Sequence, residues 1–205
     1  MTDTQKKPLW KNELVWLFLL TSGLFAILYS KFILGGYAYV FTDTGADTMQ
    51  INYAQYGLFS SLFRSGESGY VLQAGLGMDV SSYYPAYLIP YNLLILLAPQ
   101  RLLPWAVLAS AYLKMITISL VGYLFYRKLM QDGIGTMAAA LAWTFSGYVI
   151  LWGQHYGFCT CMALFTVFMY FLQCYLNGEQ RWKSAGLVLT VTMLLLSLIH
   201  ISEPT

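Results

Sequence analysis

Residues 14–34 read LVWLFLLTSGLFAILYSKFIL, an apolar stretch that follows three lysines, Lys6, Lys7 and Lys11. As an α-helix this stretch is ~31 Å long at ~1.5 Å per residue, which is enough to cross the hydrocarbon core of a bilayer. A secretory signal has a shorter apolar region followed by a cleavage site of small residues, and this sequence has neither feature. We therefore predict a retained transmembrane helix over 14–34, preceded by a cytoplasmic N-terminus over 1–13.

The composition of the whole chain also indicates a membrane protein. Of the 205 residues, 58% are hydrophobic and 10% are charged, whereas about 25% of the residues in a soluble domain are charged. Basic residues form short clusters between apolar runs, which is the pattern of a membrane protein and does not indicate nucleic-acid binding. We predict an all-α, polytopic helical bundle in the bacterial plasma membrane. Its further spans are expected at 105–126, 134–153, 158–176 and 184–195.

The basic clusters also predict the orientation of the chain, because cytoplasmic loops are enriched in lysine and arginine. The apolar stretch 86–98 is short for a span and contains Pro90. Counting it as a span would move the cluster 127–128 to the outside. We therefore expect it to lie in or dip into the outer interface, within one large outer loop over 35–104. The cytoplasmic clusters are then 6–11, 127–128 and 181–183.

The first part of the outer loop carries a helical pattern. Apolar side chains recur every three or four residues from 51 to 63, which predicts an amphipathic helix lying on the outer leaflet. Asp47, with Gln50 three residues later, resembles a capping box at the start of this helix. A capping carboxylate can also carry out chemistry, so both roles stay open for Asp47.

Lys114 lies near the middle of the predicted span 105–126. An ammonium at that depth is costly unless it is paired or faces a wet cavity, and it is therefore a candidate functional residue. We expect it to contact an anionic lipid phosphate. The alternative is a side chain that snorkels to the outer interface, which from this position is ~13 Å away.

Tyrosines are frequent in the outer loop and allow two interpretations. They form either an aromatic belt at headgroup level or a platform on which sugar rings stack. Tyr56 and Tyr84 are the candidate substrate contacts in the second interpretation. The full set is Tyr53, Tyr56, Tyr70, Tyr83, Tyr84, Tyr87 and Tyr91.

The C-terminal residues 196–205 resemble the translation of a transposase sequencing adapter, and we exclude them from fold prediction. A genuine helix end is the alternative interpretation. If the adapter interpretation holds, residues 14–195 are the N-terminal part of a longer transmembrane domain, and this fragment alone is expected to be inactive.

Several short motifs follow one another along residues 10–195. In their order, the chain resembles the N-terminal part of the bacterial YfhO-type membrane proteins, which belong with the GT-C glycosyltransferases. It departs from them after Glu67, where relatives commonly show Pro-Leu-Trp and this chain has Ser68-Gly69-Tyr70-Val71. The motifs that carry the resemblance are Gly45-Ala46-Asp47-Thr48, Ser65-Gly66-Glu67, Gly75-Leu76-Gly77, Tyr84-Pro85, Pro90-Tyr91-Asn92 and Phe145-Ser146-Gly147-Tyr148, followed by an external His155.

The resemblance implies transfer of a sugar from a polyprenyl-phosphate carrier to an envelope polymer on the outer face. It also implies an acidic residue near the membrane surface in the first outer loop, and Asp47 is the matching position. Such a reaction needs a base at the acceptor hydroxyl and positive charge at the departing phosphate. We assign Asp47 as the base and Asp43 as its helper or as a ligand of a divalent cation, while Lys114 and His155 are candidate contacts for phosphate or sugar.

Two other classes of function stay open. A lipid or polymer transporter, such as a flippase, would also place a lysine inside the bundle, and such proteins show paired repeats or interrupted helices. A noncatalytic membrane assembly subunit would need no acidic residue at the membrane surface.

Overall fold

The computed structural model describes residues 12–41, 48–67, 69–72, 77–79, 81, 89–130, 132–179 and 181–202. These residues are mostly helical, which confirms the predicted all-α fold. The elements in chain order are α1 (Glu13–Leu28), α2 (Ser30–Leu34), the π-helix η2 (Thr48–Asn52), α3 (Tyr53–Ser65), β1 (Tyr70–Val71), β2 (Met78–Asp79), α5 (Pro90–Leu97), the 3-10 helix η4 (Gln100–Leu102), α6 (Leu103–Leu129), α7 (Gly133–Thr144), α8 (Gly147–Trp152), α9 (Tyr156–Leu176) and α10 (Arg181–Ser202).

Three helical segments in the described part of the chain are long and apolar enough to cross a membrane. They are Gln100–Leu129, Gly133–Trp152 and Tyr156–Leu176, and Glu13–Leu28 and Lys183–Leu195 are shorter apolar helices. The backbone of α10 continues through Ser202, so residues 196–202 of the adapter-like segment extend this helix.

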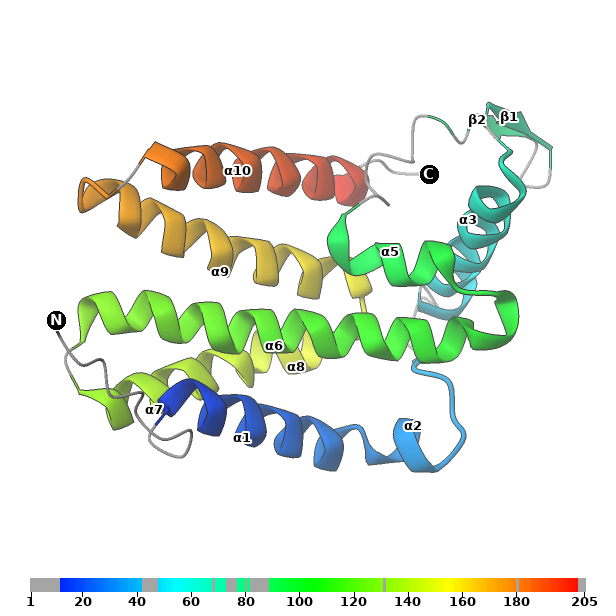
Figure 1. Ribbon diagram of the computed structural model, residues 1–205. Coiled ribbons are helices and arrows are strands. Elements are labelled where there is room, and N and C mark those ends of the chain that lie inside the picture. The colour runs from blue at the N-terminus through cyan, green and yellow to red at the C-terminus, as the bar shows by residue number, and fades with distance from the viewer. Residues whose placement is uncertain are drawn as a thin grey trace, which may run out of the picture.

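The long helices α1, α6, α7, α9 and α10 lie side by side, with α6 in the middle (Figure 1). α6 contacts α1, α5, α7 and α9, and α9 also contacts α10. The start of α1, the α6–α7 connection and the α9–α10 connection lie at one end, which we call the basic end. α2, α3, α5 and the antiparallel β1–β2 hairpin lie at the other end, which we call the loop end.

The first apolar stretch bends instead of forming one continuous helix. α1 ends at Leu28, and α2 begins after Tyr29, whose backbone leaves helical geometry at φ −101° and ψ 17°. The Tyr29 ring is buried, stacks on Phe25 with centroids 4.4 Å apart, and meets Tyr39 edge to face at 5.4 Å. This aromatic packing accounts for a break that hydropathy alone did not predict.

Hydroxyl pairs attach α1 to α6. Thr21 Oγ1 and Ser119 Oγ lie 2.7 Å apart in a buried contact, and Ser22 Oγ lies 2.8 Å from the Tyr112 hydroxyl. The Thr21–Ser119 pair gives both buried hydroxyls a hydrogen-bond partner, whereas Ser22 Oγ is half-buried and also donates to the Phe18 carbonyl. The first helix is therefore fixed against the central one by polar contacts as well as by apolar packing.

The apolar stretch 134–153 is also interrupted. α7 ends at Thr144 and α8 begins at Gly147, with Ser146 in extended geometry between them at φ −61° and ψ 154°. Serine and glycine favour such breaks because a serine side chain competes for backbone hydrogen bonds and glycine lacks a Cβ. The Trp143 indole nitrogen donates to Thr166 Oγ1 at 3.0 Å and joins α7 to α9 just before the break.

The residues 51–63, where a helix was predicted, are helical and belong to η2 and α3. Their most buried side chains include Tyr56 and Phe59, and α3 packs against α5. α3 ends at Gly66, whose φ of 71° is the left-handed conformation that ends many helices. The helical part of the stretch 86–98 is the short α5, which starts with Pro90 in its first turn, a position that suits proline.

Candidate functional site

Four residues from distant parts of the chain meet where the segment before η2 reaches the first turn of α9. They are Tyr39, Tyr56, Lys114 and Tyr156, and we call them the Tyr156 cluster. Lys114 comes from the middle of α6, and Tyr156 is the first residue of α9. All four are buried.

The Lys114 ammonium lies inside the bundle. The residue is only 2% exposed, and its Nζ donates to the Tyr156 carbonyl oxygen at 3.1 Å. Within the described ranges no carboxylate forms an ion pair with it. A buried ammonium whose observed acceptor is one neutral carbonyl is poorly compensated, because it has three donors and a full charge.

A buried hydroxyl, that of Ser110, lies one turn before Lys114. The Ser110 hydroxyl is buried, the residue is 1% exposed, and among the described residues it has no hydrogen-bond partner. Residues four apart lie on the same face of a helix. Ser110 and Lys114 therefore share one face of α6, and both have hydrogen-bonding capacity that the described residues leave unused.

The hydroxyls of Tyr39 and Tyr156 each donate to a backbone carbonyl. The Tyr156 hydroxyl donates to the Tyr39 carbonyl, and the Tyr39 hydroxyl donates to the Gly153 carbonyl at 3.2 Å. Burial is the main factor that raises the pKa of the Tyr39 hydroxyl, so this group stays a neutral donor. These bonds fix the segment after α2 on the turn between α8 and α9.

Tyr56 packs inside the cluster. Its ring stacks on Tyr156 with centroids 5.4 Å apart and an interplanar angle of 16°, and its hydroxyl donates to Asn92 Oδ1 at 3.4 Å. Burial raises the pKa of the Tyr56 hydroxyl as well. The ring faces protein on these sides, whereas Tyr70 on the hairpin is exposed.

The same turn also contacts the start of η2. Thr48 is fully buried, and its Oγ1 donates to the Gln154 carbonyl at 3.2 Å. A π-helix is rare and often occurs at functional sites, and Thr48 opens one here. The chain is therefore joined to the α8–α9 turn on both sides of residues 42–47, through Tyr39 and Thr48.

Three of the six predicted site residues lie among the described residues, and three do not. Lys114 and Tyr56 are brought together in the Tyr156 cluster. His155 is next to it in sequence, and its half-buried ring lies 5.7 Å from Trp152 and 5.8 Å from Phe158 between centroids. The remaining three, Asp43, Asp47 and Tyr84, lie outside the described residues.

The described residues contain no group of three histidine, cysteine, aspartate or glutamate side chains that could bind a metal ion. Asp79 is exposed and accepts from the backbone nitrogen and the hydroxyl of Ser81, at 3.0 and 2.6 Å. These hydrogen bonds lower the pKa of the Asp79 carboxyl. Asp79 thus has a local role in a turn.

Sequence reasoning did not single out three residues that hold the site together, Tyr39, Thr48 and Tyr156. Tyr156 had one local signal, since it directly follows His155 at the start of an apolar run. Thr48 ends one of the motifs that carry the resemblance, but nothing predicted its contact, and Tyr39 had no signal, because the partners of both are backbone carbonyls more than one hundred residues away in sequence. Comparisons with protein families, characterised proteins and solved structures gave no significant match to this chain.

Proposed function

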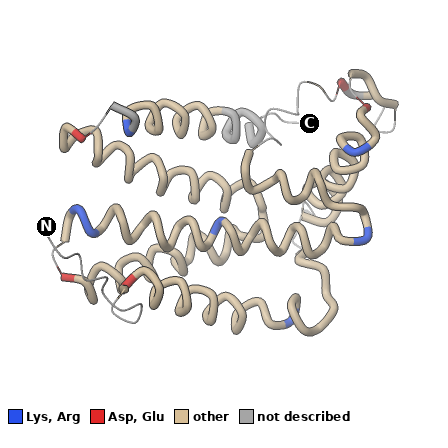
Figure 2. The backbone as a smooth tube through the Cα atoms, in the orientation of Figure 1, with Lys and Arg blue, Asp and Glu red and all other residues tan. Residues whose placement is uncertain are grey.

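We propose that the chain is a multi-pass protein of the bacterial plasma membrane, with its basic end in the cytoplasm and its loop end outside. Three long apolar helical segments support integration in a bilayer. The distribution of lysine and arginine supports the orientation (Figure 2). Lys6, Lys7 and Lys11 precede α1 in the sequence, and four more basic residues lie in the last turn of α6 or the first turn of α10, at the basic end: Arg127, Lys128, Arg181 and Lys183. Three belong to the loop end: Lys31, Arg64 and Arg101.

We further propose that the protein transfers a sugar from a polyprenyl-phosphate carrier to an envelope polymer, as the resemblance to GT-C enzymes implies. The observation that carries this proposal is the buried Lys114 ammonium, which has no carboxylate partner among the described residues. A departing phosphate needs a fixed positive charge, and a charge held away from water stabilises it most. The Ser110 hydroxyl on the same helix face, which has no hydrogen-bond partner among the described residues, adds a donor for a phosphate oxygen.

The proposed base, Asp47, directly precedes Thr48 in the sequence. Thr48 bonds to Gln154, and Lys114 bonds to Tyr156 two residues later. In the proposed reaction Asp47 takes the proton of the acceptor hydroxyl, the hydroxyl oxygen attacks the anomeric carbon, and the bond from that carbon to the phosphate oxygen breaks.

A lipid or polymer transporter is the second candidate function. The observation that favours it is the break between α7 and α8, because interrupted helices surround the substrate sites of many transporters. The Ser146 hydroxyl at this break is buried and has no hydrogen-bond partner among the described residues. A transporter would use Lys114 to bind an anionic substrate and would not need Asp47 as a base.

The test replaces single residues in the gene of the producing bacterium and measures the sugar content of the envelope polymer. Asp47→Asn is expected to abolish glycosylation at normal protein abundance, because an amide cannot accept the proton. Asp79→Asn is the matched control, since it removes an exposed loop-end carboxylate and is expected to leave sugar content unchanged. Unchanged sugar content in Asp47→Asn would refute the transferase. A defect in Lys114→Met without one in Asp47→Asn would favour the transporter.

A further inference from the structure

Three contacts show how the long helices around α6 are aligned with it. Thr21 of α1 lies beside Ser119 of α6, with their hydroxyl oxygens 2.7 Å apart. Gly122 of α6 lies against Trp143 of α7 and Thr166 of α9, since a Cβ at Gly122 would be 3.7 Å from a side-chain atom of each. These pairs fix how far α1, α9, and α7 with its continuation α8 extend along the central helix.

All three neighbours end at one level of α6 towards the loop end, the level of Tyr112. α1 runs opposite to α6 (Figure 1), and its last residue, Leu28, is seven residues past its contact with Ser119, which brings it level with Tyr112. The same count from Gly122 brings the end of α8, Trp152, close to this level. The start of α9, at Tyr156, is also level with Tyr112.

α6 itself continues beyond this level. It begins at Leu103, about nine residues before Tyr112, which is ~14 Å at ~1.5 Å per residue. Leu103 and Val107 in this part are buried, and they belong to the same apolar core as Phe59 of α3 and Ile95 of α5. The apolar face of the extension is therefore covered by loop-end helices, so burying it does not require lipid.

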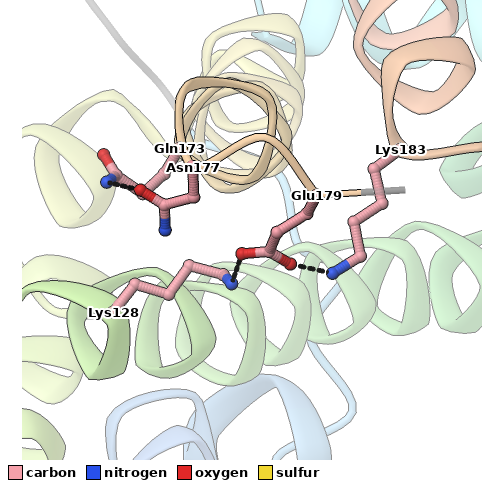
Figure 3. A network of polar contacts seen from close by, with 5 residues as sticks. All are labelled: Lys128, Gln173, Asn177, Glu179 and Lys183. Carbon is pink, nitrogen blue, oxygen red and sulfur yellow. Dashed lines mark hydrogen bonds and ion pairs between the residues drawn. The ribbon is translucent and has the colours of Figure 1, made fainter. Parts of the chain in front are cut away.

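Charged side chains mark the other end of the bundle. Glu179, in the α9–α10 connection, forms ion pairs with Lys128 near the end of α6 and with Lys183 in the first turn of α10 (Figure 3). The three side chains are 16 to 26% exposed, and charges that are partly exposed at a bundle surface are costly inside the hydrocarbon core. The core therefore ends before this network.

The length of α9 gives the distance from the network to the level of Tyr112. α9 has 21 residues from Tyr156 to Leu176, which is ~31 Å as an α-helix. The hydrocarbon core of a bilayer is about 30 Å thick. The part of the bundle between the network and Tyr156 therefore fills the core, and the extension of α6 is left outside it.

We propose that the outer boundary of the hydrocarbon core lies at the level of Tyr112 and Tyr156, so that Lys114 lies at the outer membrane surface and not in the middle of the bilayer. The middle of the core is then close to Gly122. Long side chains on a helix lean towards its N-terminus, and Lys114 accordingly reaches the Tyr156 carbonyl. An anionic ligand of Lys114 would approach from the outer headgroup layer. This inference rests on the proposed membrane integration and orientation, and it is independent of sugar transfer.

Two tryptophans of the native chain test this boundary, because they are equally exposed in the bundle but differ in expected depth. Trp105 is 51% exposed and lies ~10 Å beyond Tyr112 towards the loop end. Trp16 of α1 is 49% exposed and lies close to the level of Gly122. Hydroxyl radicals generated in water around the full chain in phosphatidylcholine nanodiscs should modify Trp105 severalfold faster than Trp16, after each rate is divided by that of the unfolded chain.

The alternative position of the bilayer gives a different result. If Lys114 lay in the middle of the core, Trp105 and Trp16 would lie at about the same depth on opposite sides of it. Equal protection of the two side chains would then be measured and would overturn the inference. Equal modification at the rates of the unfolded chain would instead refute the proposed membrane integration itself.

A second measurement compares two depths along α6. Leu113→Cys and Leu124→Cys carry a nitroxide label, in a background in which the three native cysteines are alanine, and the two leucines are 39% and 37% exposed. The label at 124 should lie deeper, with more broadening by oxygen and less by a water-soluble nickel complex. A deeper label at 113 would overturn the inference. The tryptophan comparison needs no substitution, so it decides the question if the cysteine-free chain does not fold.

Discussion

Replacing Lys114 by methionine is predicted to make the protein more stable and less active. Methionine keeps an unbranched, flexible side chain and removes the ammonium. The change deletes the hydrogen bond from Lys114 Nζ to the Tyr156 carbonyl oxygen, which is 3.1 Å long. That carbonyl keeps a second side-chain donor, because Thr160 Oγ1 also lies 3.1 Å from it. The substitution therefore leaves no new buried acceptor without a partner.

The two opposing energies can be compared. A hydrogen bond to a charged group contributes about 1.5–3 kcal/mol, and Lys114→Met loses it. The effective penalty for burying an ion is several kcal/mol, and Lys114→Met removes that penalty because the side chain is 2% exposed. We expect the free energy of unfolding to rise by roughly 1–3 kcal/mol. Each kcal/mol corresponds to a rise of ~2–4 °C in the unfolding midpoint of a chain of this size.

The assay is thermal unfolding of the purified full chain in detergent, followed by circular dichroism, together with envelope sugar content in cells. Lys31→Met is the control, because Lys31 is an exposed lysine in α2 and its replacement should change stability by less than about 0.5 kcal/mol. A lower unfolding midpoint in Lys114→Met would show that the ammonium stabilises the fold. The argument that Lys114 is held for a ligand would then fail.

Three further substitutions test individual contacts. Tyr156→Phe removes the hydroxyl that donates to the buried Tyr39 carbonyl, and the unfolding free energy should fall by about 1–3 kcal/mol; an unchanged denaturant midpoint would contradict this contact. Thr21→Val breaks the buried pair with Ser119 and should cost about 1–2 kcal/mol, with a double-mutant cycle against Ser119→Ala showing the coupling. The hydrogen-bonded lysines lower the pKa of the Glu179 carboxyl from 4.5 to about 2, so these pairs stabilise the fold above pH 4.5 and lose that effect as the pH falls toward 2. Glu179→Gln should remove this part of the acid destabilisation, measured as unfolding midpoints between pH 2 and 6, and an unaltered acid profile would exclude it.

Hydropathy predicted where the helices lie, because apolar runs as long as 105–126 and 158–176 leave the backbone few other ways to satisfy its hydrogen bonds. It did not predict the bend at Tyr29. That bend depends on the ring of Tyr39, which reaches Tyr29 only once the segment after α2 has turned back. The break at Ser146 had a local signal in the pair Ser146-Gly147. Hydropathy is averaged over a window much longer than two residues, so this pair did not change the prediction of one continuous helix.

One part of the candidate site could be predicted from the sequence and another could not. Lys114 was predicted from the cost of burying a charge, which is a property of the residue and of its position in an apolar run. Its acceptor is the backbone carbonyl of Tyr156, and every residue has such a carbonyl. Nothing in the sequence therefore predicted Tyr156 as the partner of Lys114, although the neighbouring His155 was predicted as a contact for phosphate or sugar.

The α8–α9 turn and the first residue of α9 connect Tyr39 and Thr48 to Lys114 through backbone acceptors. The carbonyls of Gly153, Gln154 and Tyr156 accept from Tyr39, Thr48 and Lys114 respectively. An anion that bound the ammonium would weaken only the third of these bonds, because an anionic acceptor is stronger than a neutral carbonyl. The first two bonds would keep the loop in place. Ligand binding at Lys114 would therefore weaken one contact of the first turn of α9, while Tyr39 and Thr48, on either side of residues 42–47, keep their bonds to the α8–α9 turn.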